Sequence, residues 1–439
     1  MKHLTDFVQE HINDDVTRLI LDRAKWPEID IDLAAACIES RRKLKNKIRE
    51  WYDNSELIFP AKLSAEQCSS TTTGIYKSKV AEQIAATISD SQQARLSDLT
   101  GGLGVDTWFF SKVLSHVSYH EMQESLCVAA EHNFKALSTE NINVRNIIVT
   151  PETIIDILEA AKPDIVYMDP ARRGENGKKV FLIEDCTPDV LTLKDQIFAK
   201  CRHILLKLSP MADITMVCDR LGTTCREVHV VASGGECKEL LVWMDREWND
   251  EYTVIAVELP AGYPQEQEAK FMFKAGEEKI SPLALLGRND MMDVGRNDMM
   301  NVGRNDMMDV GRNDMPQMYL FEPGKALMKA GCFNLVAERF ELNKLGASTH
   351  YYITDNQDIA SSLKQYGKVY GIISCQPLDK RTIKSAGKEY PHSEVTARNI
   401  PMDTDTLRKK LGVTSGDDAH IFGLKSDKFG NLLLITDRY

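Results

Sequence analysis

The chain has 439 residues, of which 43% are hydrophobic, with a formal net charge of −11 and a pI near 5.5. This length and composition predict two or three domains with real cores. The acidic balance argues against a protein that coats nucleic acid through bulk charge. The ten cysteines form no C-x-x-C pair, so neither a zinc site nor a disulfide framework is indicated. With no signal peptide and no apolar run long enough to cross a bilayer, we expect a cytoplasmic protein without membrane partners.

Residues 1–70 are predicted to form a helical N-terminal region. Apolar residues recur at helical spacing in residues 4–12 and again from Asp30 to Trp51. The second half of this longer stripe, ESRRKLKNKIREW, is strongly basic. It is either a solvated helix face or a surface that contacts phosphates, and the sequence leaves both interpretations open.

The next predicted domain covers residues 71–250 and begins with a helix. Pro60 and a cluster of Ser and Thr break the preceding helical pattern. The helix is therefore expected to start near Ile75, with Thr72 or Thr73 as its cap. It leads directly into the first strand of an alternating pattern of strands and helices.

The stretch SDLTGGLGVD, residues 97–106, combines a strand end, a glycine-rich turn and a helix start. The strand, residues 94–99, contains Asp98, and the glycines let the main chain turn tightly and approach a ligand. The last glycine of a dinucleotide fingerprint is missing, because Thr107 stands in its place. The spacing is nearer to the first motif of class I methyltransferases that use S-adenosylmethionine (SAM), with Thr100 replacing the usual first glycine. Alone, it fits either a nucleotide-type site or an ordinary tight turn.

Strands and helices then alternate, as is typical of a parallel sheet with helices on both faces. One strand ends in Glu121, 23 positions after Asp98, about where an acidic residue holds ribose hydroxyls in this fold type, although a surface carboxylate is the alternative. A final hairpin favours a methyltransferase over an NAD-binding domain, which would continue with another helix and parallel strand. The predicted strands are 117–121, 146–150, 164–168 and 203–208, the helices 124–137 and 151–161, and the hairpin strands 226–233 and 239–244.

The stretch YMDPARRGENGKK, residues 167–179, predicts a second part of the site. A buried strand ends on Asp169 at the carboxyl edge of the sheet, where ligands bind in such folds. Pro170 stiffens the backbone just after it, and Arg172 and Arg173 can direct guanidinium groups at phosphate or carboxylate.

On these motifs the chain resembles a bacterial family of class I SAM-dependent methyltransferases with a THUMP-like C-terminal domain, generally regarded as RNA methylases. The resemblance implies an α/β fold: a Rossmann-like class I methyltransferase sheet, N-terminal helices and a small C-terminal α+β domain. It also implies SAM as cofactor, RNA as partner and no metal. The matching segments cover almost the whole chain and are LSAEQCSS, DLTGGLGVD, YMDPARRG, LLKLSPMAD, VVASGGECKEL and the part from YLFEPGKALMKAG to the end.

The resemblance also implies the site residues. Tyr76 and Lys77, with Gln67, would lie over the methionine end of the cofactor, although helix packing explains them equally well. The candidate catalytic residues are Asp169, Pro170, Arg172 and Arg173, and the candidate cofactor-binding residues are Asp98, Thr100, Gly102, Gly104, Glu121, Tyr76 and Lys77.

Two departures from related motifs affect the expected reaction. Methyltransferases that act on amino groups usually carry a second proline and an aromatic residue after the acidic residue and first proline. Here Ala171 and Arg172 follow Pro170, so Arg172 or another segment would have to stack on the target base. Methylases that act on carbon 5 of pyrimidines need a cysteine where this chain has LysLeuSerPro, residues 207–210, and Cys375 lies far outside the α/β region.

The predicted function is therefore methyl transfer from SAM to a nucleobase nitrogen in RNA. Two alternatives stay open. The chain could bind SAM or RNA without catalysis, or it could methylate a protein or a small molecule.

The C-terminal half is divided into three predicted parts. Residues 251–286 are a connecting α+β segment, and residues 287–315 repeat GRNDMMDV as a poorly ordered insertion. Residues 316–439 are predicted to form the THUMP-like domain, with basic residues that either contact RNA or form a solvated rim. Its predicted elements are a helix at 323–340, strands at 349–354 and 368–377, a helix within 398–411 and a hairpin of 420–426 and 431–437; its basic residues are Lys380, Arg381, Lys384, Lys388, Arg408, Lys409 and Lys410.

Overall fold

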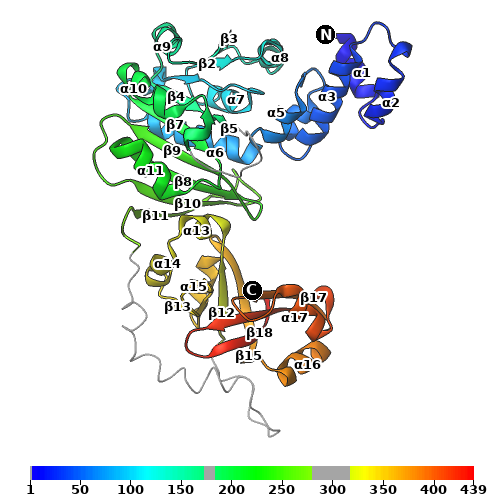
Figure 1. Ribbon diagram of the computed structural model, residues 1–439, viewed down its shortest axis with the longest axis vertical. Helices are drawn as coiled ribbons and strands as arrows, with labels where there is room; N and C mark the ends of the chain where they lie inside the picture. Colours follow the sequence, from blue (N-terminus) through cyan, green and yellow to red (C-terminus); the bar gives the residue numbers. More distant parts are fainter. Residues whose placement is uncertain (1, 173–182, 279–316) are drawn as a thin grey trace. The chain divides into compact units, whose positions relative to one another are not determined.

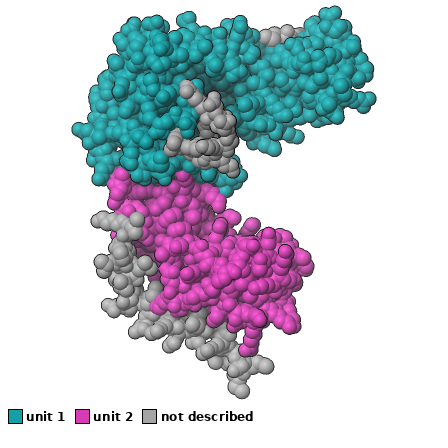
Figure 2. Space-filling model, in the orientation of Figure 1, with its two compact units in different colours: residues 1–255, 261–267 teal, residues 256–260, 268–439 magenta. Residues whose placement is uncertain are grey.

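The computed structural model describes residues 2–172, 183–278 and 317–439. The chain forms two compact units (Figure 2). The first, in teal, is made of residues 1–255 and 261–267, and the second, in magenta, of residues 256–260 and 268–439. The octapeptide repeat lies outside the described residues.

The N-terminal region consists of short helices, as the apolar spacing predicts. The stripe from Asp30 to Trp51 forms two helices, because the backbone leaves the helical conformation at Ile48 (φ −140°, ψ 86°). Asp30 caps the first of them by accepting a hydrogen bond from the Leu33 N–H at 3.0 Å. The helices are α1 (Lys2–Glu10), α2 (Val16–Leu21), η1 (Arg23–Lys25), α3 (Ile31–Leu44), α4 (Arg49–Asp53) and α5 (Lys62–Gln67).

Three cations of the basic stretch donate to backbone carbonyls of the protein itself. The Arg41 side chain is 1% exposed and donates to three backbone carbonyls of residues 52–57 at 2.7–2.8 Å. Arg42 and Lys47 also donate to backbone carbonyls of other helices and loops. The interpretation as a phosphate-contacting face therefore fails for the buried Arg41, and all three side chains help to fix the N-terminal region.

Seven strands of the first unit form one sheet in the order β3-β2-β1-β4-β7-β9-β8, with helices on both faces (Figure 1). The first five run parallel, and β9 lies antiparallel between β7 and β8. The predicted closing hairpin is thus confirmed. The strands are β1 (Arg95–Asp98), β2 (His116–Glu121), β3 (Ile142–Asn146), β4 (Ile165–Met168), β7 (His203–Leu208), β8 (Cys225–Ser233) and β9 (Glu236–Asp245). The helices are α6 (Thr71–Ala85), α7 (Val105–Ser111), α8 (Glu124–Ala136), α9 (Ile154–Ala161), α10 (Val190–Lys200) and α11 (Ile214–Leu221).

Short pieces complete this unit. Strand β5 (Ala171–Arg172) pairs antiparallel with β6 (Cys186–Thr187) in a separate two-stranded sheet. The remaining turns are the 3-10 helices η2 (Ser91–Gln93), η3 (Ile183–Asp185) and η4 (Gly222–Thr224).

The third strand lies earlier in the chain than predicted. It pairs with β2 from Val117↔Ile142 to Glu121↔Asn146, so the predicted strand at 146–150 is wrong. As the sheet's edge, β3 is only partly buried and carries polar residues, whereas the apolar residues after it lie in a loop. Ile148 there is 56% exposed.

Two helix starts also differ from the prediction. Ser70, not Thr72 or Thr73, caps α6: its hydroxyl accepts the Thr73 N–H at 3.3 Å, and the Thr73 hydroxyl accepts the Ser70 N–H in return. Helix α9 begins at Ile154, and Pro151 lies in the turn before it. The reciprocal hydrogen bonds of Ser70 and Thr73 decide the start of α6, whereas the cap residue of α9, Thr153, makes no such side-chain capping bond.

The second unit contains a sheet in the order β13-β14-β12-β15-β18-β17-β16. Its neighbours pair antiparallel except β16 and β17, and the predicted closing hairpin is confirmed as β17 and β18. Ile383 and Leu407 pack from α16 and α17 onto Ile421 and Leu433 of the sheet. The strands of this sheet are β12 (Tyr319–Pro323), β13 (Asn343–Lys344), β14 (Tyr352–Thr354), β15 (Gly367–Pro377), β16 (His392–Arg398), β17 (Thr414–Ser426) and β18 (Gly430–Arg438). The unit also contains β11 (Ala269–Lys274) and most of β10 (Thr253–Leu259), which begins in the first unit. The helices are α13 (Lys325–Ala330), α14 (Phe333–Arg339), α15 (Gln357–Leu363), α16 (Lys380–Glu389) and α17 (Thr404–Leu411).

The helix predicted at 323–340 is two helices. Gly331 ends α13 in the left-handed conformation (φ 75°), which stops the first helix before the second begins.

We predict that Arg41→Ala lowers the free energy of unfolding by about 3 kcal/mol, because the buried carbonyls lose a charged donor. Arg49→Ala is the control, since Arg49 is exposed and water screens its ion pair with Asp53, so that its loss should be clearly smaller. Urea unfolding of both variants measures the two losses. Equal losses would show that Arg41 has no special structural role.

Candidate functional site

Three acidic residues meet at the carboxyl edge of the parallel sheet. Strand β1 pairs with both neighbours so that Asp98 lies opposite Tyr119 of β2 and Tyr167 of β4. Two residues further along, these neighbouring strands reach Glu121 and Asp169. The structure therefore brings together the acids that the sequence placed at three separate strand ends.

The glycine-rich turn fits against an aromatic ring and must be built from glycines. A Cβ at Gly101 would lie 2.2 Å from the ring of Tyr119, so no larger residue fits there. Gly104 has φ +86°, and a Cβ there would lie 2.7 Å from Phe134. The Tyr119 hydroxyl donates to the carbonyl oxygen of Gly102 at 2.6 Å. Tyr119 and Gly101 thus shape the turn, although neither was a predicted site residue.

Glu121 connects the end of β2 to this turn. Its carboxylate accepts the backbone N–H of Gly102 at 2.9 Å and that of Gln123 at 2.8 Å. Asn146 donates its side-chain amide to the carbonyl oxygens of Glu121 and Met122, at 3.0 and 3.1 Å. The loops after β2 and β3 are thereby joined.

Thr100 connects the ends of β1 and β4. Its N–H donates to Asp98 at 2.9 Å, and its hydroxyl accepts the backbone N–H of Asp169 at 2.6 Å. A glycine, the usual first residue of the class I methyltransferase motif, has no hydroxyl to accept this bond. The departure from the motif therefore has a structural role.

Asp98 is buried below the turn and is 1% exposed. Burial raises its pKa to about 7, although hydrogen bonds from the Thr107 hydroxyl at 2.6 Å and the Thr100 N–H act in the opposite direction. Asp98 thus supports the turn from inside the protein.

Tyr76 and Lys77 lie in the core between α6 and the sheet. The Tyr76 hydroxyl makes a hydrogen bond with Nδ1 of His229 at 2.7 Å. The Lys77 ammonium donates to both oxygens of Glu239, at 2.8 and 2.9 Å, and to the Ser69 hydroxyl at 2.9 Å. Both side chains are fully buried, so they face interior partners in this structure.

Three charged residues that were not among the predicted site residues lie beside the site: Asp106, Lys207 and Glu239. Asp106 accepts hydrogen bonds from the hydroxyls of Tyr167 at 2.7 Å and Ser69 at 3.0 Å. Burial would raise the pKa of Asp106, but nearby lysines hold it below its usual value. Lys207 appeared in the sequence only as the residue at a missing cysteine's position. Nothing in the local pattern marks these residues, because strand pairing brings them together.

The transfer-site candidates are only partly described. Asp169 is 37% exposed and makes an ion pair with Lys207. Pro170 follows directly, and the backbone of Arg172 lies in the short strand β5. The Arg172 side chain and the whole of Arg173 lie outside the described residues.

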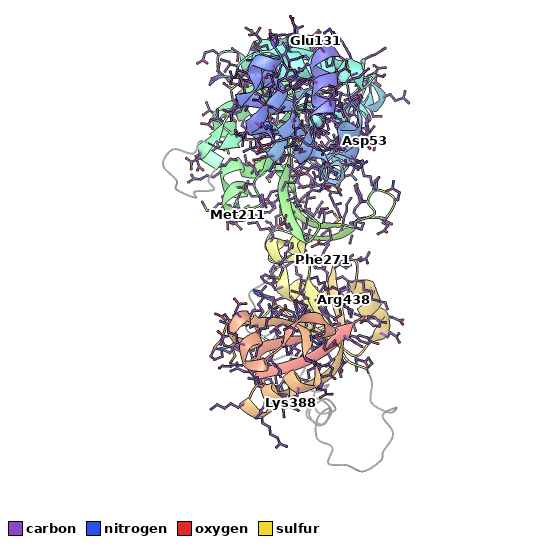
Figure 3. The ribbon with its side chains drawn as sticks, turned by 90° about the vertical axis from the view of Figure 1, so that its right-hand side faces the viewer. Asp53, Glu131, Met211, Phe271, Lys388 and Arg438 are labelled. Atoms are coloured by element: carbon purple, nitrogen blue, oxygen red, sulfur yellow. The ribbon has the colours of Figure 1, made fainter. Side chains whose placement is uncertain are left out.

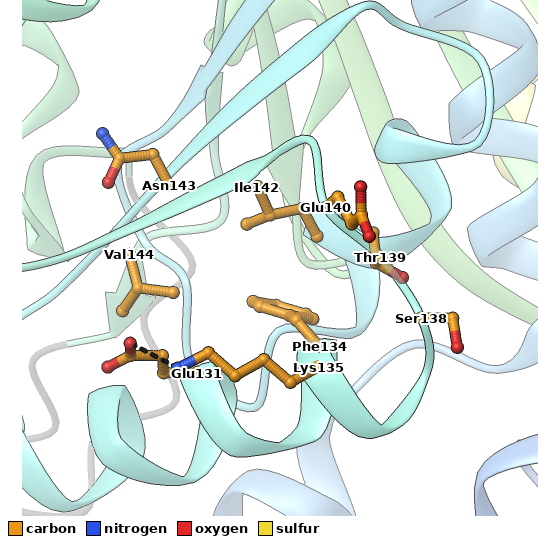
Figure 4. Close-up of a pocket in the computed structure, with 9 residues that line it drawn as sticks. All are labelled: Glu131, Phe134, Lys135, Ser138, Thr139, Glu140, Ile142, Asn143 and Val144. Atoms are coloured by element: carbon orange, nitrogen blue, oxygen red, sulfur yellow. Dashed lines mark hydrogen bonds and ion pairs between the residues drawn. The ribbon is translucent and has the colours of Figure 1, made fainter.

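A hollow of about 620 Å³ lies elsewhere on the sheet (Figure 4). It is lined by the end of α8 and the beginning of β3, with Ile142, the first residue of that strand, on its wall. It therefore starts at the amino edge of the sheet, away from Asp169, and is not the candidate site. Within the described ranges no group of His, Cys, Asp and Glu could hold a metal ion, and no helix could span a membrane.

We predict that Asp98→Asn gains stability relative to the native chain as the pH rises. The unfolded pKa of an aspartate is about 3.9. Because the folded value is higher, the stability that Asp98 contributes is complete below about pH 4 and is lost as the pH rises to about 7. The difference in unfolding free energy between the variants should change by at most about 1.4 kcal/mol per pH unit. Urea unfolding at several pH values measures it, and a constant difference would contradict the burial argument.

The chain is similar to known proteins over both of its units. Residues 319–359 match a family described as a ferredoxin-like domain, and residues 367–438 match one described as THUMP domain-like. The whole chain is similar to a crystal structure titled "putative methyltransferase" from Porphyromonas gingivalis W83, with 27% identity and a TM-score of 0.76 over 99% of this chain and 97% of that one. A comparison with curated protein sequences finds no match.

Two further structures align with only part of the chain. An rRNA methylase from Streptococcus thermophilus has 13% identity and a TM-score of 0.29 over 39% of this chain and 96% of its own. SMU.1697c from Streptococcus mutans, titled "putative methyltransferase" and solved in complex with SAH, has 14% identity and a TM-score of 0.28 over 38% of this chain and 96% of its own.

The full-length likeness, the strand order and the THUMP-like match agree on the architecture. The chain has the α/β sheet of a class I methyltransferase, N-terminal helices and a small THUMP-like C-terminal domain, as in the bacterial family that its sequence resembles.

Proposed function

We propose that this protein transfers a methyl group from SAM to a nucleobase nitrogen in RNA. One observation carries the proposal: a single glycine-rich turn is hydrogen-bonded to the strand-end acids Asp98 and Glu121 and to the backbone of Asp169. A cofactor at this turn would therefore lie beside Asp169. This is the placement that a two-substrate transfer needs.

The residues around Glu121 fit the adenosine part of SAM. Glu121 would hold the ribose hydroxyls, as an acidic residue does at this position of similar sheets. Met122 and Ile148 are 61% and 56% exposed, and the Asn146 amide joins the loops that carry them. Exposed apolar side chains at a polar edge suit the flat face of an adenine ring. The glycine turn would hold the methionine end.

Asp169 has the transfer role in this proposal. SAM, when bound, supplies an electrophilic methyl group on its sulfonium. The carboxylate of Asp169 would accept a hydrogen bond from the target N–H and hold the nitrogen in line with the methyl group. It need not be a strong base, because the proton can leave to water after the new N–C bond has formed.

The second unit offers the surface for RNA. Its residues 367–438 match the THUMP-like family. Helices α16 and α17, which pack on the sheet, carry exposed basic side chains. Figure 3 labels Lys388, one of the exposed lysines of α16. Clustered exposed cations provide local attraction for phosphates on a protein that is acidic as a whole.

We predict that Asp169→Ala keeps SAM affinity within about threefold and lowers methyl transfer at least about 100-fold, because it removes an acceptor that does not bind the cofactor. The assay follows tritium from labelled SAM into total RNA from a deletion strain, with and without ribonuclease. Asp53→Ala, an exposed acid elsewhere, should leave the rate unchanged.

The outcomes of this assay separate the alternatives. Label that survives ribonuclease would move the substrate to protein or a small molecule. SAM binding without any label would favour a non-catalytic binding protein. Native turnover in Asp169→Ala would remove Asp169 from the mechanism.

We predict that the triple variant of Lys380, Lys384 and Lys388 to Glu weakens RNA binding at least about tenfold and makes it less dependent on salt. The control reverses Lys135, Lys200 and Lys238 in the first unit, which changes the net charge equally. Fluorescence titration with fragmented total RNA at several salt concentrations measures both. Equal weakening in the two triple variants would indicate a bulk charge effect.

A further inference from the structure

Lys207 lies beside Asp169 at the end of the next strand. Met168 of β4 pairs with Leu206 of β7, so Asp169 and Lys207 follow at neighbouring positions on parallel strands. The Lys207 ammonium binds oxygen Oδ2 of Asp169. The structure records no hydrogen bond to Oδ1 among the residues it describes.

Buried acids hold Lys207 in place. The side chain of Lys207 is 15% exposed, and the carboxylates of Glu239 and Asp106 attract its ammonium from within the protein. Burial would lower the pKa of Lys207, but Asp169, Glu239 and Asp106 together raise it, so the ammonium keeps its charge.

Lys77 pairs with two of the same acids. Its ammonium is paired with Glu239 at 2.8 Å and Asp106 at 3.4 Å. Two lysines and three acids therefore form one network beneath the carboxyl edge. Because a buried charge without a partner is costly, each member restrains the others.

We propose that Lys207 is a positioning residue of the methyl-transfer site, which orients Asp169 by binding its Oδ2 so that Oδ1 is directed to the target N–H. The inference rests on the proposed function of Asp169. Asp169 is held at two points: its backbone N–H donates to the Thr100 hydroxyl, and its carboxylate accepts a hydrogen bond from the Lys207 ammonium. A carboxylate held in this way loses little freedom when the target binds, which favours a productive geometry.

The test is a double-mutant cycle with the tritium assay on RNA from the deletion strain. We expect Lys207→Met to lower kcat about 10- to 100-fold and to leave the KM for SAM unchanged. Lys207→Arg, which keeps the charge and the donors, should recover most of the rate. In an Asp169→Asn background, Lys207→Met should cost nothing further, because both changes remove the same acceptor geometry.

Lys194→Met is the control, since Lys194 donates to the carbonyl oxygen of Leu221 in another part of the unit. If Lys207→Met has a lower urea midpoint than Lys194→Met, Lys207→Gln replaces it in the cycle. The proposal would be overturned if the two mutations lowered kcat by independent factors that multiply in the double variant. It would also be overturned if Lys207→Met raised the KM for SAM and left kcat unchanged.

A crystal structure of Lys207→Met gives a readout that does not depend on activity. We expect the Asp169 carboxylate to turn away from its native orientation, and an unchanged orientation would also overturn the inference. Absence of label with the native protein would instead count against the proposed function, so the two failures are distinguishable.

Discussion

The hydroxyl of Thr100 joins two neighbouring strands at the place where ligands bind in parallel sheets. It accepts the Asp169 N–H, while the Thr100 N–H binds Asp98. Through these bonds the glycine turn, the end of β1 and the end of β4 form one rigid corner. The other parts of the candidate site depend on this corner. Glu121 accepts the N–H of Gly102 in the turn, and Asp169 is bound to Thr100 through its own N–H.

A buried polar network supports the corner from below. Ion pairs in a protein interior are costly to desolvate and stabilise only when every partner is present. Here Lys77 of α6 binds Glu239 of β9, and Asp106 of α7 binds the hydroxyl of Tyr167 of β4. The network therefore fixes α6 and α7 against the sheet directly beneath the site. Apolar packing alone would set neither the orientation of these side chains nor the charge at this place.

The N-terminal region is held in place by side chains that bind backbone groups and by aromatic packing. A basic sequence stretch looks like a phosphate-binding face, yet Arg41 uses its charge to satisfy backbone carbonyls in the interior. Asn133 of α8 likewise exchanges two hydrogen bonds of 2.8 Å with the backbone of Ile58. Trp51 and Phe59 then pack with Trp108 of α7 in one cluster. The region is thus attached to the methyltransferase-like sheet by polar bonds and by apolar packing.

The sequence by itself determined the alternation of strands and helices, the glycine turn and the acids at strand ends, because these follow from periodicity and from local backbone chemistry. It misplaced β3, because an edge strand is too polar to be distinguished from the apolar loop that follows it. Only the tertiary structure decided that Asp106, Lys207 and Glu239 gather beside Asp169 and that Tyr76 and Lys77 face the core. These contacts join residues up to 162 positions apart, so they depend on strand order and helix packing, which no local pattern records.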